Sequence, residues 1–212
     1  MRIAIIGAGS VGGALGRGWA AAGHAIRFGL RDPAAGKYAP LASTGTLLSP
    51  VAAAEGAEAI LLATPWPQAE AAIAGLGDLA GRLLIDATNP LAVGPAGLGL
   101  AIGHTESGGE RVAGWAPGAR VVKAFNTTGA NIMDSARRGF ALPPVMFAAG
   151  DDAAAKAAVL GLIRDLGFEA VDAGPLANAR LLEAHAMLWI DLALKRGLGR
   201  EQAFALMRRE GG

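Results

Sequence analysis

Cysteine is absent from the 212 residues, and the three histidines, His24, His104 and His185, are scattered along the chain. A chain without thiols has no disulfide, no thiolate nucleophile and no thiolate metal ligand. The histidines show no metal-ligand spacing, so no metal site is predicted. Aromatic residues make up only 5% of the chain, which argues against a stacking platform for single-stranded nucleic acid.

Excess charge and long apolar runs are also missing. The 19 basic and 18 acidic residues nearly cancel and form no basic stripe, so we expect no nucleic-acid partner. Every apolar run is interrupted before it is long enough to span a bilayer, and the chain opens on a strand pattern rather than a secretion signal. We therefore expect a cytoplasmic protein without a membrane partner.

Small apolar residues are abundant instead. Hydrophobic residues account for 52% of the chain and charged residues for 17%, and there are 32 glycines. This composition allows a well-filled core and excludes global disorder. The length suits one domain, or one domain with a small appendage.

Short apolar runs alternate with segments of helical periodicity. This rhythm predicts an α/β fold of the Rossmann type: a doubly wound, mainly parallel sheet with helices on both faces. The expected strands are residues 2–6, 24–28, 46–48, 58–63, 83–86, 120–125, 145–149 and 168–172. The expected helices are residues 10–22, 50–55, 68–74, 105–115, a short one after 129, and 152–166.

Two stretches stand apart from this rhythm. Residues 91–103 are rich in glycine and lack periodicity, so we predict a loop, the natural candidate to close over a ligand. Two helices, over residues 176–196 and 200–209, are expected at the end of the chain. The first of them is apolar nearly all round, which favours a homodimer.

The turn after the first expected strand fits the pattern G-x-G-x-x-G. Its residues are Gly7, Ala8, Gly9, Ser10, Val11 and Gly12. It directly follows a strand and opens a helix, which is the context of a dinucleotide-binding turn. In such turns the first glycine permits a tight bend, the second lets the backbone approach a pyrophosphate, and the third lets the helix pack on the sheet. We expect the pyrophosphate at the N-terminus of that helix.

The end of the second expected strand favours NADP(H) over NAD(H). NAD-specific sites usually carry an acid there, but this chain has Gly29, followed by Leu30 and Arg31. The guanidinium of Arg31 suits a 2′-phosphate, and Lys37 adds a second cation. Asp32 favours NAD(H) instead, unless it caps the following turn.

From these elements we divide the chain into an NADP-binding Rossmann-like domain (1–174) and C-terminal helices (175–212). These helices pack on the same domain or on a dimer partner.

Short polar side chains follow three other expected strands. Thr64, Pro65 and Trp66 come after one of them, Asn89 after the next and Asn126 after the third. Ligands of doubly wound sheets bind beyond the carboxyl ends of the strands, so these residues are candidates for a pocket. Trp66, Asn89 and Asn126 are the candidates for contact with a substrate. The alternative is that these residues serve only as turn formers.

Side chains for acid–base catalysis are scarce. His104 lies in the glycine-rich stretch, Lys123 inside a strand, and Glu183 and His185 on the long apolar helix. We interpret His185 as a core or interface residue and assign no catalytic residue. Hydride exchange between two redox cofactors needs alignment, whereas imine or ketone reduction usually needs a proton donor.

A series of motifs carries a resemblance to one known family. The motifs are GAGSVG, GLRD, ATPW, IDATNP, VVKAFNTTGA, FAAGDD and DAGPLANARLLEAHAMLWI, in this order. Together they resemble the deazaflavin-dependent NADP reductases, whose best-known members are the F-420:NADP oxidoreductases. The resemblance runs from Met1 to about Ile190. The oxidoreductase domain of the STEAP metalloreductases and the N-terminal domain of the pyrroline-5-carboxylate reductases are similar as well.

The resemblance implies hydride transfer between NADP(H) and a deazaflavin, coenzyme F-420, or a flavin. It implies a pyrophosphate site on Gly9, Ser10 and Val11, and a 2′-phosphate site on Leu30 and Arg31. The nicotinamide is implied near Thr64, Pro65, Trp66 and Ala130, with the deazaflavin stacked on it near Asn126. Archaeal members carry a histidine at that last position, so a quinone-like acceptor or a metal chelate stays open.

Two other functions stay open at this point. One is an imine or carbonyl reductase of the pyrroline-5-carboxylate reductase type. The other is a non-catalytic NADPH-binding sensor, which the scarcity of acid–base side chains allows.

Overall fold

The structure, a computed structural model, describes residues 1–95, 97–136 and 138–209 of the chain. Its main sheet consists of β1 (Arg2–Ile6), β2 (Ala25–Gly29), β3 (Thr46–Leu48), β4 (Ala59–Leu62), β5 (Leu83–Asp86), β8 (Arg120–Ala124), β9 (Val145–Gly150) and β10 (Glu169–Asp172). The strand order is β10-β9-β8-β5-β4-β1-β2-β3. Neighbouring strands are parallel except for β8 and β9. The predicted Rossmann-type, mainly parallel sheet is confirmed.

The direction of winding reverses between β1 and β4. From β1 the chain continues to β2 and β3 on one side of the sheet, and to β4, β5 and β8 on the other. Doubly wound sheets bind ligands beyond the carboxyl ends of the strands at such a switch point. The fold therefore predicts a ligand site at the loops after β1 and β4.

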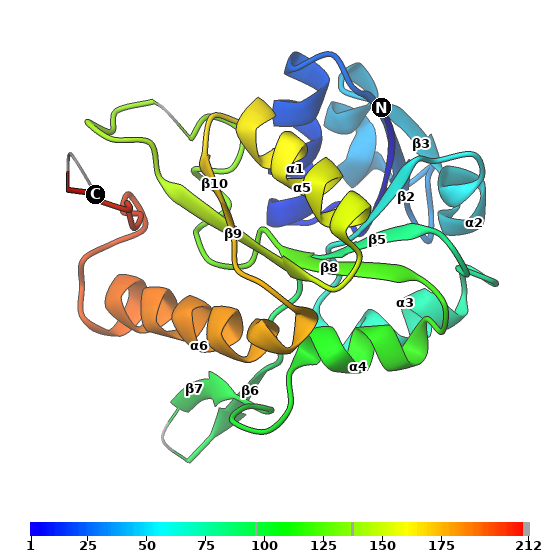
Figure 1. Cartoon of the computed structure of the whole chain (residues 1–212). Helices are drawn as coiled ribbons and strands as arrows, with labels where there is room; N and C mark the ends of the chain where they lie inside the picture. The colour runs from blue at the N-terminus through cyan, green and yellow to red at the C-terminus, as the bar shows by residue number, and fades with distance from the viewer. Residues whose placement is uncertain (96, 137, 210–212) are drawn as a thin grey trace.

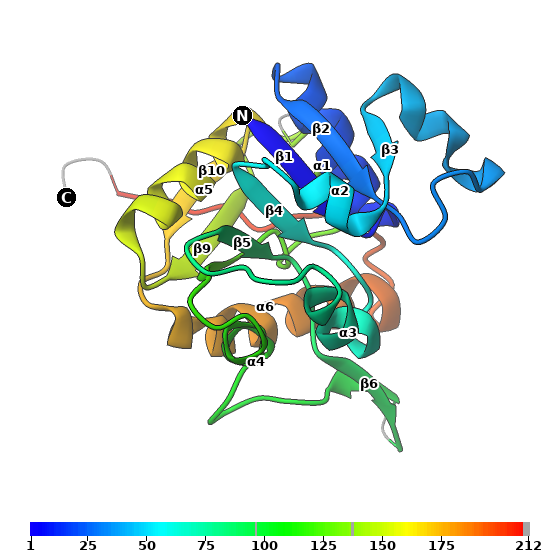
Figure 2. The same cartoon turned by 90° about the vertical axis from the view of Figure 1, so that its right-hand side faces the viewer.

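Helices cover both faces of the sheet (Figures 1 and 2). On one face lie α1 (Ser10–Ala21) and α5 (Ala153–Asp165), and the other face carries α2 (Pro50–Ala54), α3 (Ala69–Ala74), α4 (Gly108–Trp115) and α6 (Ala179–Ile190). Alternate residues of β1 enter the two cores, Ile3 and Ile5 on the α1 side and Ala4 and Ile6 on the α2 side. This alternation explains why the strand is apolar from Ile3 to Ile6.

Two of the helix starts follow directly from their capping residues. The Ser49 hydroxyl accepts a hydrogen bond from the Ala52 N–H at 3.4 Å, and the Asp152 carboxylate accepts one from the Ala155 N–H at 2.7 Å. Both residues stand where an N-cap satisfies an orphan amide of the first turn. The predicted starts of α2 and α5 are confirmed.

The predicted loop over residues 91–103 is wrong. The structure has a hairpin there, in which β6 (Leu91–Gly94) pairs antiparallel with β7 (Gly97–Leu100). The cross-strand pairs Leu91–Leu100 and Val93–Leu98 bring apolar side chains together. Glycines carry no hydrophobic pattern, so the two-residue period of these strands is hidden in the sequence.

The predicted helix over residues 200–209 is also wrong, because the chain runs there without regular structure. Its carbonyl groups are engaged by other parts of the fold: the Trp189 side chain donates to the Gln202 carbonyl at 2.9 Å, and the Val145 N–H donates to the Phe204 carbonyl at 2.9 Å. These long-range hydrogen bonds override a weak local helix preference. Likewise, the short helix expected after residue 129 is a series of turns.

The long C-terminal helix is present with varying pitch. A 3₁₀ turn η3 (Leu176–Asn178) leads into α6, and a π turn η4 (Asp191–Lys195) ends it. Among the described residues, no helix has both the length and the apolar content needed to cross a membrane.

Candidate functional site

The glycine turn after β1 has the geometry that its motif predicts. Gly7 has φ = +99°, and a Cβ atom there would lie 2.7 Å from the Ala63 carbonyl oxygen. A Cβ atom at Gly12 would lie 2.0 Å from the Gly7 carbonyl oxygen. Both positions therefore require glycine. Gly9 differs, because no heavy atom lies within 4 Å of a Cβ placed there, so its backbone faces open space.

The N-terminus of α1 is suited to an anion. The helix begins after Gly9 with no capping side chain and no acidic residue in its first turn. The first amides of a helix have no partner within it, and together with the helix dipole they attract negative charge. Ser10, the first helical residue, is exposed beside them. This turn can hold a phosphate group.

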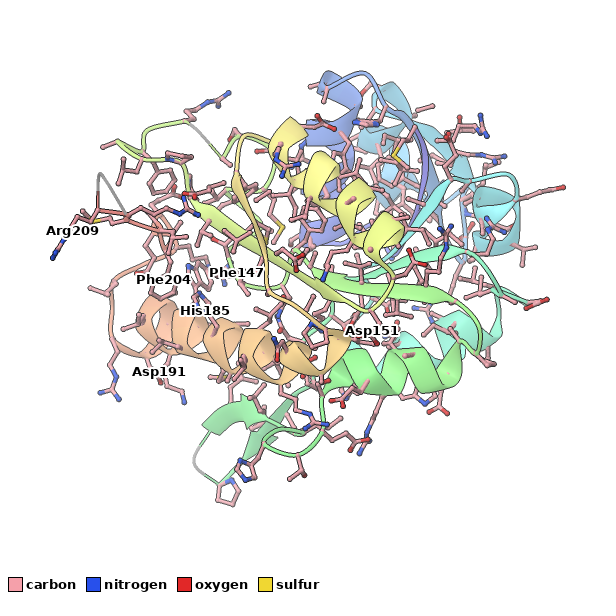
Figure 3. All side chains as sticks on the ribbon, in the orientation of Figure 1. Phe147, Asp151, His185, Asp191, Phe204 and Arg209 are labelled. Carbon is pink, nitrogen blue, oxygen red and sulfur yellow. The ribbon has the colours of Figure 1, made fainter. Side chains whose placement is uncertain are left out.

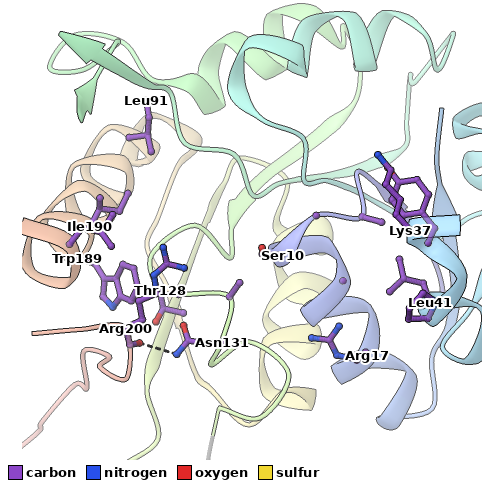
Figure 4. Close-up of a pocket in the computed structure, with 18 of the residues that line it drawn as sticks. Ser10, Arg17, Lys37, Leu41, Leu91, Thr128, Asn131, Trp189, Ile190 and Arg200 are labelled. Atoms are coloured by element: carbon purple, nitrogen blue, oxygen red, sulfur yellow. Dashed lines mark hydrogen bonds between the residues drawn. The ribbon is translucent and has the colours of Figure 1, made fainter. Parts of the chain in front are cut away.

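A cavity of about 930 Å³ opens in front of the glycine turn (Figure 4). One part, which we call the glycine half, is lined by Ala8, Gly9, Ser10, Gly13, Arg17 and four residues of the 3₁₀ segment η1 (Gly36–Ser43), namely Lys37, Tyr38, Pro40 and Leu41. The other part, which we call the α6 half, is lined by Leu91, Leu98, Thr128, Gly129, Ala130, Asn131, Trp189, Ile190, Leu194 and Arg200.

The charge of the cavity lining has one sign. Arg17, Lys37 and Arg200 line it, and no carboxylate of the described part of the chain does. Arg17 is neutralised by Asp134, with 3.0 Å between guanidinium nitrogen and carboxylate oxygen. The Lys37 ammonium lies 4.8 Å from the centre of the Tyr38 ring and forms no ion pair with a described residue. The cavity therefore favours an anionic ligand, although the whole chain has a net charge of only +1.

The end of β2 leaves no room for the acid of an NAD-specific site. A Cβ atom at Gly29 would lie 2.7 Å from Ile6 Cδ1 and 3.0 Å from Pro50 Cα. Asp32 caps the following turn, because its carboxylate accepts from the Ala34 N–H at 3.2 Å. Among the residues predicted for the 2′-phosphate, Lys37 lines the cavity, whereas Leu30 is buried and Arg31 is exposed outside the lining.

The predicted residues Asn89 and Asn126 meet, as the sequence suggested. Asn126 Nδ2 donates to Asn89 Oδ1 at 3.0 Å, and Asn89 Nδ2 donates to the Asn126 carbonyl at 3.0 Å. Asn126 Oδ1 is buried without a hydrogen-bond partner among the described residues. The preceding Phe125 has φ = +62°, a strained value for a residue with a side chain, and such strain often occurs at functional sites.

The loop after β4 lies beside the glycine turn but outside the cavity lining. Gly7 approaches Thr64, since a Cβ at Gly7 would lie 3.0 Å from the Thr64 nitrogen. Trp66 packs against Trp115, with 5.2 Å between ring centres. Of the residues expected around the nicotinamide, only Ala130 lines the cavity, and Thr64, Pro65 and Trp66 do not.

A buried ionic cluster behind the site was not predicted. Lys123 Nζ lies 2.8 Å from Asp86 Oδ2 and 2.9 Å from Glu183 Oε1, with all three side chains at most 1% exposed. Burial opposes the charge on Lys123, but the two carboxylates prevail and raise the pKa of its ammonium group. Asp86 and Lys123 are paired across β5 and β8. The lysine inside an apolar strand could have indicated this cluster, because a buried charge needs a partner of opposite charge.

His185 lies outside the cavity lining, in an aromatic cluster. Its ring centre is 5.5 Å from that of Phe147 and 4.5 Å from that of Phe204 (Figure 3). Burial lowers the pKa of its imidazole, so the neutral form dominates at neutral pH. The structure places His185 in packing between α6, β9 and the C-terminal segment.

Comparison with known proteins identifies relatives of this chain. The family described as NADP oxidoreductase, coenzyme F-420-dependent, matches residues 2–90. A crystal structure from Arthrobacter sp. FB24, described as an F-420-dependent NADP reductase, is 33% identical, with a TM-score of 0.88 over 98% of this chain and 100% of that one. Protein SMa0349 of Sinorhizobium meliloti is 31% identical, with a TM-score of 0.72 over 84% of this chain and 86% of that one.

Two further relatives are more distant. Metalloreductase STEAP3 of Rattus norvegicus is 28% identical over 186 residues, which are 86% of this chain. The chain spans only 36% of the length of that curated relative. A reductive aminase from Aspergillus terreus, solved with NADPH, shares the fold at 22% identity, with a TM-score of 0.68 over 92% of this chain and 62% of that one.

The similarity to the Arthrobacter protein extends over nearly all of this chain and all of that one, and the family match includes the glycine turn and the strands around it. The protein therefore belongs to the family of coenzyme F-420-dependent NADP oxidoreductases.

Proposed function

We propose that this protein transfers a hydride between NADP(H) and a deazaflavin, coenzyme F-420, or a related flavin. The observation that carries the proposal is the cavity. It joins a helix start suited to an anion to a largely apolar compartment, and among residues 1–95, 97–136 and 138–209 no imidazole and no carboxylate lines it. A reaction between two redox rings needs little more from a protein than binding and alignment.

The residues of the glycine half fit NADP(H). The open space beside Gly9 lets a pyrophosphate approach the backbone, and the free amides at the start of α1 can donate to it. Lys37 supplies a cation for a 2′-phosphate, with Arg31 as the second predicted cation. The crowding at Gly29 excludes the carboxylate that would repel this phosphate.

The residues of the α6 half fit a flat aromatic acceptor. Leu91 and Leu98 come from the hairpin, and Trp189, Ile190 and Leu194 from the end of the long helix. When bound, NADPH supplies the hydride from its nicotinamide ring. The chain itself holds two rings against each other, and its apolar walls exclude water from the space between them. Asn89 and Asn126, the candidates for contact with the substrate, lie outside the cavity lining, and the unpartnered Asn126 Oδ1 is buried.

Reduction of imines or carbonyls is the runner-up, because reductive aminases share the fold. Such reductions usually need a proton donor. The phenol of Tyr38 lines the cavity and is a candidate proton donor, but it lies beside Lys37 in the glycine half. The α6 half, where an acceptor would sit, has Thr128 as its hydroxyl group.

The experiment has two stages. The protein is first titrated with NADPH and NADH, and we expect much tighter binding of NADPH. Oxidised coenzyme F-420, flavins, cyclic imines and a ferric chelate are then added separately to the NADPH complex, and absorbance is followed. Turnover with F-420 or a flavin is the expected result. Turnover with imines alone would support the runner-up, and tight NADPH binding without any turnover would support a sensor.

A further inference from the structure

Arg200 is a cation of the α6 half that NADP(H) binding leaves unused. Its side chain lines the cavity and is exposed, and it forms no ion pair with a described residue. In Figure 4 Arg200 lies beside Thr128 and Trp189, on the opposite side of the view from Lys37. The phosphates assigned to the glycine half therefore do not account for it.

Three other arginines of the C-terminal region have acidic partners. Arg180 pairs with Glu110, Arg208 pairs with Glu169, and Arg196 lies 3.0 Å from the Asp191 carboxylate. Arg200 differs from them because none of the described residues that line the cavity carries a carboxylate. A guanidinium beside apolar walls, with no acidic partner among the described residues, can form a charge-assisted hydrogen bond with an anionic group of a ligand.

The backbone at Arg200 is held by groups of the cavity wall. Asn131 Nδ2 donates to the Arg200 carbonyl at 3.0 Å and to Glu201 Oε1 at 2.9 Å. Trp189 Nε1 donates to the Gln202 carbonyl at 2.9 Å. The Trp189 ring packs on Gly129, where a Cβ atom would lie 2.7 Å from it. The position of Arg200 is therefore tied to the same residues that shape the α6 half.

We propose that Arg200 binds an anionic substituent of the second substrate, a phosphate or a carboxylate. The acceptor then has a flat ring between the hairpin and α6, and an acidic side chain that reaches the guanidinium. This inference rests on the proposed function, because it concerns the acceptor of the same cavity. It makes Arg200 a residue that determines acceptor specificity, while the hydride step itself stays with the two rings.

The test compares acceptors that share a ring and differ in charge. FMN carries a phosphate, riboflavin carries none, and a flavin with a carboxyalkyl chain carries a carboxylate. Wild type, Arg200→Gln, Arg200→Lys and the control Arg196→Gln are assayed with NADPH and each flavin. Arg196 is an exposed arginine outside the cavity lining, so it matches Arg200 in type but not in place.

We expect Arg200→Gln to lower kcat/KM for FMN about tenfold, the usual effect of losing one charge-assisted contact. The value for riboflavin and the affinity for NADPH should not change, and Arg200→Lys should recover part of the loss. A loss with the carboxyalkyl flavin but not with FMN would identify a carboxylate as the anion. Equal losses for FMN and riboflavin, or no loss with either anionic flavin, would overturn the proposal.

A binding measurement separates this proposal from the proposed function. Quenching of flavin fluorescence reports binding of FMN and riboflavin to the NADP⁺-loaded protein without any turnover. The carboxyalkyl flavin is measured in the same way. If no acceptor is reduced, the proposed function fails. The role of Arg200 would still be upheld if the protein binds FMN or the carboxyalkyl flavin more tightly than riboflavin and Arg200→Gln abolishes this preference, and it would be refuted if neither anionic flavin is preferred.

Discussion

Gly9 and Gly12 belong to the same turn but have opposite surroundings. Since the space beside Gly9 is empty and its φ is −74°, Gly9→Ala should fold normally. Its methyl group should displace a pyrophosphate and weaken NADPH binding at least about tenfold. Gly12→Ala meets the Gly7 carbonyl instead and should lower the free energy of unfolding by about 1–3 kcal/mol.

Thermal denaturation and NADPH titration of both variants check this contrast. The pair acts as its own control, because the two substitutions add the same methyl group three positions apart. Normal NADPH binding by Gly9→Ala would show that the backbone of this turn does not approach the cofactor.

Lys37 and Arg31 should select the 2′-phosphate. Lys37→Gln should weaken NADPH binding about tenfold and leave NADH binding almost unchanged, because only NADPH offers a phosphate to the lost cation. Arg31→Gln should act in the same direction. Fluorescence titration with both dinucleotides measures the effect, with Arg164→Gln, an exposed arginine of α5, as control. Equal losses for NADPH and NADH would contradict the assignment.

The glycine turn was predictable because each glycine of the motif has its own steric reason: a tight bend, the approach of a pyrophosphate, or close packing of the helix on the sheet. For Asp32 the sequence left two interpretations open, and the hydrogen bond from the Ala34 N–H favours the turn cap. Arg200 was not predictable, since nothing local distinguishes it from the other arginines near the C-terminus. Its role depends on Asn131 and Trp189, which are distant in sequence.

At the next scale, Lys123 joins three elements, β5, β8 and α6, through Asp86 and Glu183. Glu183 also accepts from the amides of Gly108 and Gly109 at the start of α4, at 2.9 and 3.0 Å. Replacing Lys123 by methionine leaves two buried carboxylates without a cation. The free energy of unfolding should fall by about 3–5 kcal/mol at neutral pH.

This contribution has a defined pH dependence. The carboxylates raise the native pKa of Lys123 above the ordinary 10.5, so the ammonium stabilises the fold fully below pH 10.5. The contribution is lost as the pH rises through the raised native value. Denaturation of wild type and Lys123→Met across alkaline pH should show a constant difference that shrinks only above 10.5. A difference that already shrinks near neutral pH would contradict the direction of the shift.

Elements with a buried face were predicted well, and elements without one were not. Strands such as β1 and β4 are continuous apolar runs, and α5 carries its own cap and period. The hairpin β6–β7 has no fully buried residue and is rich in glycine, so its sequence lacks the alternation of apolar and polar residues that predicts a strand. The C-terminal segment owes its path to hydrogen bonds from Trp189 and Val145, which no local propensity encodes.

For the molecule as a whole, the homodimer stays a prediction. The exposed side of α6 carries Leu181 and Leu188, which are 67% and 51% exposed. They lie seven residues apart and so share one side of the helix. We expect light scattering to give a dimer, and Leu181→Glu with Leu188→Glu to shift the mass toward a monomer. A monomeric wild type at high protein concentration would refute the prediction.

The fold class was predictable because alternating strands and helices have few ways to bury their apolar faces. The cavity was predictable only in its glycine half, where one motif supplies most of the wall. The α6 half combines the hairpin, the loop after β8, the end of α6 and the C-terminal segment. Such a compartment exists only in the assembled molecule, and three of these four segments, all but the end of α6, were predicted wholly or partly with the wrong structure.

The central claim is direct hydride transfer between two rings held in this cavity. The measurement is a single turnover of oxidised coenzyme F-420 with NADPH deuterated at either face of its reacting carbon, in ordinary water, analysed by mass spectrometry. The reduced deazaflavin holds the transferred hydrogen on carbon, where it does not exchange. We expect deuterium in the product from one of the two labelled forms. A reduced deazaflavin with hydrogen from water only, or an NADPH complex that reduces neither F-420 nor a flavin, would contradict the account.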